Sequence, residues 1–408
     1  MGNCRIDISN DTMTINVFTL TSPIHDKKAI GIETERFLGS IAAPDTQMQL
    51  QSDFSAYGKA ELDLIYVRTG GTEGLFRKVW ESGVLQGQPV RLLTSGKSNS
   101  LAASIEILTW LRAQGADGEI LHGEESYISG RIRTLAKSEE VRRTLNGQRA
   151  GIIGKPSDWL IASQADAEKV RTRWGIELVE IPMEELLEEY RKHDYPIAAR
   201  RRVKTCPSDY FVGALELYGA IRRIVDKHRL DALTVRCFDL LTTVKNTGCL
   251  ALALLNEEGI PSSCEGDVPA LLTMMLSRAL TGQSGFQANP ARINPETGEV
   301  LFAHCTVPLN MVKDYHWDTH FESGIGVAIH GELPTGDATL LKVSGDLERW
   351  FAEDVTLVRN QYEDQLCRTQ VVLQTHDAAR YLLNDPIGNH HVIASGHHAE
   401  AVQAVMER

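Results

Sequence analysis

The chain alternates short apolar runs, each suited to one buried strand, with longer stretches of helical periodicity. Clear runs in the first half are TINVFTL at 14–20, LDLIYVRTGG at 62–71 and VRLLTSG at 90–96. Between them lie stretches such as NSLAASIEILTWLRAQG at 99–115. This order is typical of a parallel sheet with helices on its faces, because each parallel connection needs a crossover segment that is usually helical.

A second unit of the same kind begins after the charged helical stretch at 131–147. A strand and a turn are predicted in RAGIIGKPSDWLIAS at 149–163, a long helix at 210–228 and a further strand, LTVRCF, at 233–238. We therefore place a boundary near 147 and predict two Rossmann-like doubly wound domains, at 1–147 and 148–289.

From about 290 the pattern changes to short runs rich in Val, Thr, Leu and Phe, separated by Gly, Pro and Asp. Such runs are typical of an antiparallel sheet or a small barrel. The predicted fold class is therefore α/β, with two Rossmann-like doubly wound domains and a C-terminal antiparallel β-barrel-like domain at 290–408.

Charge and hydropathy exclude several partners. The 408 residues carry 42 Lys and Arg against 54 Asp and Glu, and no basic block, which argues against nucleic acid and against a membrane surface. Apolar runs such as CLALALL at 249–255 are shorter than the roughly 18 residues that a membrane helix needs. Seven cysteines without a C-x-x-C pair fit neither a disulfide framework nor a thiolate zinc site, so we expect a cytoplasmic protein.

Two acidic residues are predicted at the carboxyl ends of strands in the second unit. Ligands bind there in open parallel sheets, because loops and helix N-termini converge at that edge. Asp239 directly follows LTVRCF, and Glu265 follows IPSSC. Asp267 and Pro269 are typical of an N-cap and the first turn of a helix. A cap explains Asp267 but not Glu265, which makes Glu265 the leading functional candidate.

Histidines give a second signal, because nine of the 13 fall in the predicted β-rich part. The candidates are His304 at the end of LFAHC and the pair His390 and His391. Taken singly, each is better explained by a surface or core role. Glu265 with two distant histidines would nevertheless form an open site for a metal such as Mn²⁺, which accepts carboxylate and imidazole ligands together.

Five motifs occur in order: CEGDVPALLTMML at 264–276, GFQANP at 285–290, LFAHCTVP at 301–308, HFESG at 320–324 and GNHH at 388–391. In sequence and spacing they resemble the L-fucose isomerase family and, more broadly, the sugar isomerases that include L-arabinose isomerase. The resemblance implies two Rossmann-like domains, a barrel-like domain and a homo-oligomer. It also implies an intramolecular oxidoreductase that interconverts an aldose and a ketose of a small-molecule sugar through an enediol.

The same resemblance implies a divalent metal, usually Mn²⁺, that stabilises the negative charge of the enediol while acid/base groups move a proton between C1 and C2. Glu265 matches the first metal-binding and acid/base carboxylate of the family. His390 matches the C-terminal histidine ligand, with His391 as the alternative. His304 matches a histidine that binds metal in the arabinose enzymes.

The chain departs from the family at GFQANP, where a second carboxylate is expected and Asn289 stands instead. An amide oxygen can bind a metal but cannot accept a proton near neutral pH. Asp239 or Asp267 would then supply the base, or one carboxylate would suffice. The leading hypothesis is a metal-dependent isomerase of a sugar or modified sugar. The alternatives are an epimerase with the same chemistry and a non-catalytic sugar-binding protein.

Overall fold

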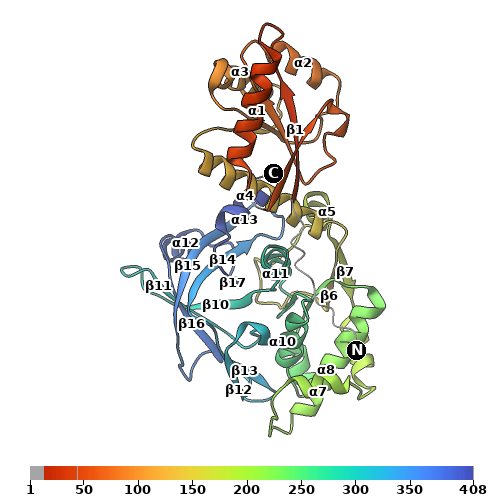
Figure 1. The fold of residues 1–408 in the computed structure, drawn as a ribbon. Coiled ribbons are helices and arrows are strands. Elements are labelled where there is room, and N and C mark those ends of the chain that lie inside the picture. Colours follow the sequence, from red (N-terminus) through yellow and green to blue (C-terminus); the bar gives the residue numbers. More distant parts are fainter. Residues whose placement is uncertain (1–12, 44, 408) are drawn as a thin grey trace. The chain divides into compact units, whose positions relative to one another are not determined.

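The computed structural model describes residues 13–43 and 45–407. The chain divides into two compact units, Met1–Glu140 and Val141–Arg408. In Figure 1 the first unit is coloured from red to brown and the second from yellow-green to blue.

The first unit is a doubly wound α/β domain with a five-stranded parallel sheet of order β2-β1-β3-β4-β5. Strands β3 and β4 are buried along their whole length, because helices cover both faces of a parallel sheet, and their sequences are apolar except for Asp63 and Arg91. The strands are β1 (Met13–Leu20), β2 (Thr46–Gln51), β3 (Leu62–Val67), β4 (Val90–Leu93) and β5 (Gly118–Leu121). The helices are α1 (Lys27–Ile41), α2 (Glu73–Glu81), α3 (Ser100–Ala113) and α4 (Glu125–Leu145), with the short 3-10 turns η1 (Phe54–Ala56) and η2 (Lys97–Asn99).

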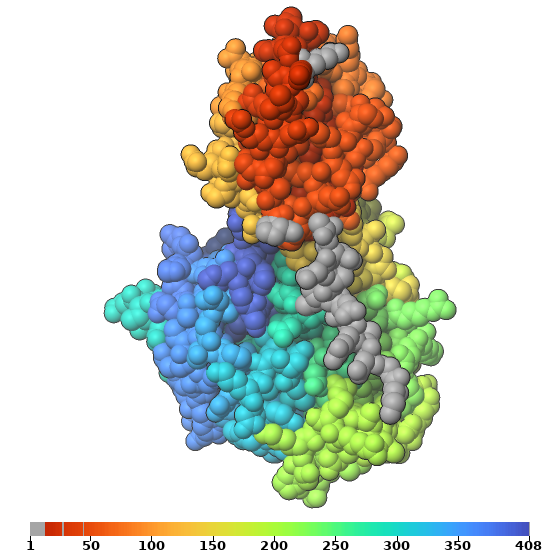
Figure 2. Space-filling view, viewed as in Figure 1, coloured from red at the N-terminus to blue at the C-terminus, as the bar shows by residue number. Residues whose placement is uncertain are grey.

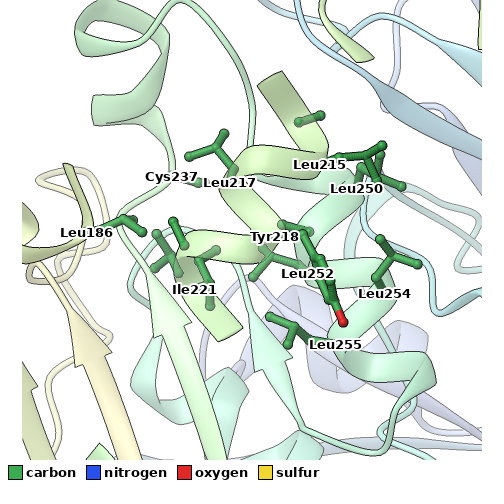
Figure 3. Close-up of a cluster of buried hydrophobic side chains, with 14 of the residues drawn as sticks. Leu186, Leu215, Leu217, Tyr218, Ile221, Cys237, Leu250, Leu252, Leu254 and Leu255 are labelled. Carbon is green, nitrogen blue, oxygen red and sulfur yellow. The ribbon is translucent and has the colours of Figure 1, made fainter. Parts of the chain in front are cut away.

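The second unit begins with a four-stranded parallel sheet of order β7-β6-β8-β9. Its strands are β6 (Arg149–Ile153), β7 (Glu177–Ile181), β8 (Ala232–Val235) and β9 (Ser262–Ser263). Its helices are α5 (Ala167–Trp174), α6 (Met183–Tyr190), α7 (Ile197–Arg202), α8 (Phe211–His228), α9 (Phe238–Thr243), α10 (Cys249–Glu257) and α11 (Val268–Thr281). Apolar side chains of α8 and α10 form one core cluster, shown in Figure 3.

The rest of the second unit is a closed antiparallel barrel with strand order β10-β11-β16-β15-β14-β17. Its strands are β10 (Phe286–Ile293), β11 (Glu299–His304), β14 (Gly336–Val343), β15 (Trp350–Asn360), β16 (Thr369–Gln374) and β17 (His391–Ser395). A hairpin of β12 (Asp314–Asp318) and β13 (Ala328–Glu332), the turn η3 (Leu309–Met311) and the helices α12 (Ala378–Asn384) and α13 (Ala399–Met406) accompany it. Figure 2 shows the barrel residues, cyan to blue, in continuous contact with green residues of the same unit.

Helix α11 connects the parallel sheet of the second unit to the barrel. It is buried on almost every face, and its side chains pack with Leu341 and Val392 of the barrel. Neighbouring barrel residues Leu340 and Ile393 belong instead to the barrel's own core cluster, as the two-residue period of a strand requires. The start of α11 is therefore held rigidly between two structural elements.

The predicted fold class is confirmed, with parallel Rossmann-like sheets followed by a closed antiparallel barrel. The boundary predicted near 147 lies close to the division between the compact units, and the one at 289/290 falls inside β10. The strand predicted at 233–238 is too long, since β8 ends at Val235 and α9 begins at Phe238. A short apolar run does not distinguish a strand from the buried start of a helix.

No helix among residues 13–43 and 45–407 is long and apolar enough to cross a membrane. Six cysteines lie in this part of the chain, and all of them are free thiols. Cys4 lies outside the described residues.

Candidate metal centre

Glu265 lies in a sharp turn between β9 and α11. Its φ of +67° and the φ of +71° at Gly266 are both left-handed, a conformation that is costly for a residue with a side chain. A Cβ on Gly266 would lie 2.5 Å from the Lys155 carbonyl oxygen, so only glycine fits. The Ser157 N–H donates to the Glu265 carbonyl oxygen at 2.9 Å, which ties the turn to the segment after β6.

The two oxygens of the Glu265 carboxylate have different neighbours. Oε2 accepts a 2.7 Å hydrogen bond from Trp159 Nε1. Oε1 lies 3.4 Å from His390 Nε2, without the angles of a hydrogen bond. Glu265 is only 9% exposed, so this carboxylate is held away from bulk water.

His390 is oriented by Asp267, the N-cap of α11. The imidazole is fully buried, and its Nδ1 lies 2.8 Å from Asp267 Oδ2. The other oxygen of Asp267 accepts from the Ala270 N–H at 2.8 Å, which confirms the predicted cap. A carboxylate on one ring nitrogen leaves the other free as a ligand, which is the usual arrangement behind a metal-bound histidine.

His304 completes the group from the end of β11. Its Nδ1 lies 2.8 Å from Thr306 Oγ1, and its ring stands edge-on to the ring of His390 with centroids 5.4 Å apart. One ligand atom each from Glu265, His304 and His390 lies within 4.8 Å of the others. All three residues are buried, and both histidines have a partner on Nδ1, which leaves Nε2 for a metal.

The donor set fits a divalent cation. In the part of the chain that the structure describes, His390 Nε2 and Asn289 Oδ1 are buried without a hydrogen-bond partner. Leaving such atoms unpaired costs about 1–3 kcal/mol each. A cation bound by Glu265, His304 and His390 would give His390 Nε2 a partner, and a mixed oxygen and imidazole set suits Mn²⁺ and similar ions. Asn289 lies on β10 opposite Ala303, the residue before His304.

The charges of the site are strongly coupled. Burial by itself would raise the pKa of Glu265, but His390 and the Trp159 hydrogen bond outweigh it and lower this pKa to about 2. Burial would lower the pKa of His390, but Asp267 and Glu265 raise it to about 9. Burial, aided by the charge of His390, lowers the pKa of His304 to about 3. Without metal, an imidazolium at His390 therefore faces two carboxylates, and a bound cation would replace its proton.

A buried lysine adds a further charge behind the centre. Lys342 on β14 is 1% exposed, and its Nζ has no hydrogen-bond partner among residues 13–43 and 45–407. Burial would raise the pKa of Asp267, but the charge of Lys342 and the hydrogen bond with His390 hold this pKa well below its usual range. Asp267 therefore caps α11, contacts His390 and interacts electrostatically with Lys342.

Two candidate residues lie apart from this group. Asp239, in the first turn of α9, accepts from Arg236 Nε at 3.0 Å. His391 has partners on both ring nitrogens, with Nδ1 at 3.0 Å from the Asn389 carbonyl oxygen and Nε2 at 3.1 Å from the Tyr381 hydroxyl. Neither residue belongs to the group formed by Glu265, His304 and His390.

Sequence reasoning missed three contributors: Trp159, Lys342 and the contact of Asp267 with His390. Trp159 lies in RAGIIGKPSDWLIAS, from which only a strand and a turn are predicted. Lys342 lies in an ordinary β-run. The sequence predicts Asp267 as a cap and as a possible base but not as the partner of His390, which is 123 residues away in the chain.

Curated relatives of the chain are named sulfoquinovose isomerase. One from Clostridium sp. (strain MSTE9) is 26% identical over 320 residues, which cover 71% of this chain and 68% of the relative. One from Priestia aryabhattai is 23% identical over 240 residues, about half of either protein. One from Alkalicoccus urumqiensis is 19% identical over 333 residues, 76% of this chain and 74% of the relative. No protein-family model matches the chain. The similarity to sugar isomerases confirms the predicted enzyme class.

Proposed function

We propose that this protein is a divalent-metal-dependent aldose–ketose isomerase, similar to L-fucose isomerase, whose substrate is a sulfonated hexose such as sulfoquinovose. The observation that carries the proposal is the buried group of Glu265, His304 and His390, with ligand atoms within 4.8 Å of one another. The named activity of the relatives supports the substrate class. A homo-oligomer in the cytoplasm is part of the proposal.

In this proposal Glu265 and the Nε2 atoms of His304 and His390 hold the metal. We propose Asn289 Oδ1, which is buried without a partner among the described residues, as a further ligand. Mn²⁺ is the proposed ion. When bound, it would polarise neighbouring oxygens of the open-chain sugar and stabilise the charge of the enediol. Asp267 and Thr306 keep the two imidazoles in the tautomer that leaves Nε2 free.

Proton transfer between C1 and C2 falls to Glu265 in this chain. Asn289 cannot accept a proton, Asp239 is bound to Arg236, and Asp267 is occupied by the helix start and His390. Glu265 is ionised at neutral pH, as a base must be before it accepts a proton. We therefore propose that Glu265 takes the proton from C2 and returns it to C1 on the same face of a cis-enediol, while the hydroxyl proton passes from O2 to O1.

The test is a substrate screen with the purified full-length protein, stripped of metal and reloaded with Mn²⁺. Sulfoquinovose, glucose, glucose 6-phosphate and L-fucose are compared, with ketose formation measured by NMR. Conversion of sulfoquinovose to its ketose that depends on Mn²⁺ is expected. An epimer as product would favour the epimerase alternative, and a bound but unchanged sugar would favour a sugar-binding protein.

Metal binding should stabilise the fold, because the ligands come from distant parts of the second unit. A metal present at 100 times its Kd adds about 2.7 kcal/mol to the free energy of unfolding, which raises the Tm by several degrees. We expect this increase when Mn²⁺ is titrated into the wild type and into His391→Gln. We expect none in His390→Gln. Equal increases in both variants would contradict the assignment of His390 as the ligand.

Asn289→Asp should tighten Mn²⁺ binding. The change adds one negative charge at an atom that is already buried without a partner, and an anionic oxygen binds a divalent cation more strongly than an amide does. Isothermal titration should show a lower Kd for the variant than for the wild type. An unchanged Kd would mean that Asn289 is only a strand residue of β10, not the turn residue that the sequence also allows.

A further inference from the structure

Trp159 is an unusual neighbour for a buried functional carboxylate. The residue is 52% exposed, yet its indole N–H donates a 2.7 Å hydrogen bond to Oε2 of Glu265, which is 9% exposed. An exposed indole N–H has water available as an acceptor, so stability of the tryptophan alone does not require this contact. A short hydrogen bond to an ionised acceptor is about twice as strong as a neutral one.

The segment after β6 that contains Trp159 forms hydrogen bonds with residues of the Glu265 turn. Ser157 N–H donates to the Glu265 carbonyl oxygen at 2.9 Å, and Ser163 Oγ lies 3.4 Å from Asp267 Oδ2. The indole also packs edge-on against Phe238 of α9, with ring centroids 4.8 Å apart. Backbone and aromatic contacts therefore fix the position of the Trp159 indole N–H, and the Glu265 carboxylate accepts from it there.

This contact makes the two oxygens of Glu265 inequivalent. Oε2 is held by Trp159, whereas Oε1 faces Nε2 of His390 at 3.4 Å, on the side of the metal-binding group. We propose that Trp159 is a positioning residue, which fixes the Glu265 carboxylate so that Oε1 binds the metal and the carboxylate cannot turn to bind through both oxygens. The inference rests on the proposed function, because it needs a metal at Glu265.

The test uses Trp159→Phe, which removes the N–H and keeps an aromatic ring against Phe238. Trp110→Phe is the matched control, since Trp110 lies in an aromatic group with Phe76 and Trp80 in the first unit. Mn²⁺ affinity is measured by titration of the metal-free proteins. We expect Trp159→Phe to raise the Kd about 10- to 100-fold, the range typical for loss of a residue that orients a metal ligand. Trp110→Phe should bind Mn²⁺ as the wild type does.

The hydrogen bond from Trp159 to Glu265 is tested in the metal-free protein by the indole ¹⁵N–¹H NMR signals. The signal of Trp159 is the one that disappears in Trp159→Phe, and we expect it to move when Glu265→Ala removes its acceptor. With Co²⁺ bound, the emission that is lost in Trp159→Phe should be quenched.

The failures can be told apart. If the wild type binds no Mn²⁺, both the proposed function and the positioning role of Trp159 are wrong. If the wild type binds Mn²⁺ and Trp159→Phe binds it equally well, the positioning role alone is overturned. If the NMR signal of Trp159 has the same chemical shift in Glu265→Ala as in the wild type, the positioning role is also overturned.

Discussion

Glu265→Gln is expected to lower isomerase turnover by about a thousandfold or more. The amide keeps the size of the side chain and can still accept from Trp159, but it carries no charge for a cation and cannot take a proton. Loss of one strong electrostatic contact costs about 10²- to 10³-fold, and loss of a general base about 10²- to 10⁴-fold. Steady-state rates on sulfoquinovose with saturating Mn²⁺ measure the effect.

Asp239→Asn is the control for this prediction. It neutralises a carboxylate that also follows a strand of the same sheet but is bound to Arg236 outside the group of Glu265, His304 and His390. We expect its turnover to stay within a few-fold of the wild type. Wild-type turnover in Glu265→Gln, with normal thermal unfolding, would overturn the role of Glu265.

Asp267→Ala is expected to destabilise the protein by about 3–5 kcal/mol, the typical cost of leaving a buried charge without its partner. The alanine would leave His390 without its carboxylate and would remove the negative charge that interacts with the charge of Lys342. Loss of the N-cap of α11 adds about 1 kcal/mol. Urea unfolding of the metal-free protein measures the change in the free energy of unfolding.

Asp267→Asn separates the contribution of the N-cap from that of the carboxylate charge. Asparagine caps helices as well as aspartate, so the helix start should survive. Its one amide oxygen then accepts from the Ala270 N–H, and its NH2 group cannot accept from His390 Nδ1. The charge is lost, and we expect Mn²⁺ affinity to fall about 10- to 100-fold, as for other residues that hold a metal-bound histidine. Equal stability of the Ala and Asn variants would contradict the importance of the cap, and unchanged Mn²⁺ affinity in Asp267→Asn would contradict the importance of the contact with His390.

Much of the fold could be predicted because the signals are local. A parallel strand covered on both faces is mainly apolar, as in β3 and β4. Successive residues of a barrel strand point to opposite faces, as Leu340 and Leu341 show. The cap of α11 was equally readable, because an N-cap contacts an N–H only three residues away. The end of β8 was not, since Phe238 is apolar both as a strand residue and as the first residue of α9.

The sequence by itself identified Glu265, His304 and His390 as candidates through their motifs, and the order of strands and helices through periodicity. The tertiary structure alone decided which candidates meet. It joins Trp159 to Glu265 across 106 residues and His390 to Asp267 across 123, while it turns His391 toward Tyr381. No local period encodes such pairs, because barrel closure and the packing of α11 bring them together. The same packing buries Lys342 behind Asp267, so the charge balance of the centre is a property of the folded chain.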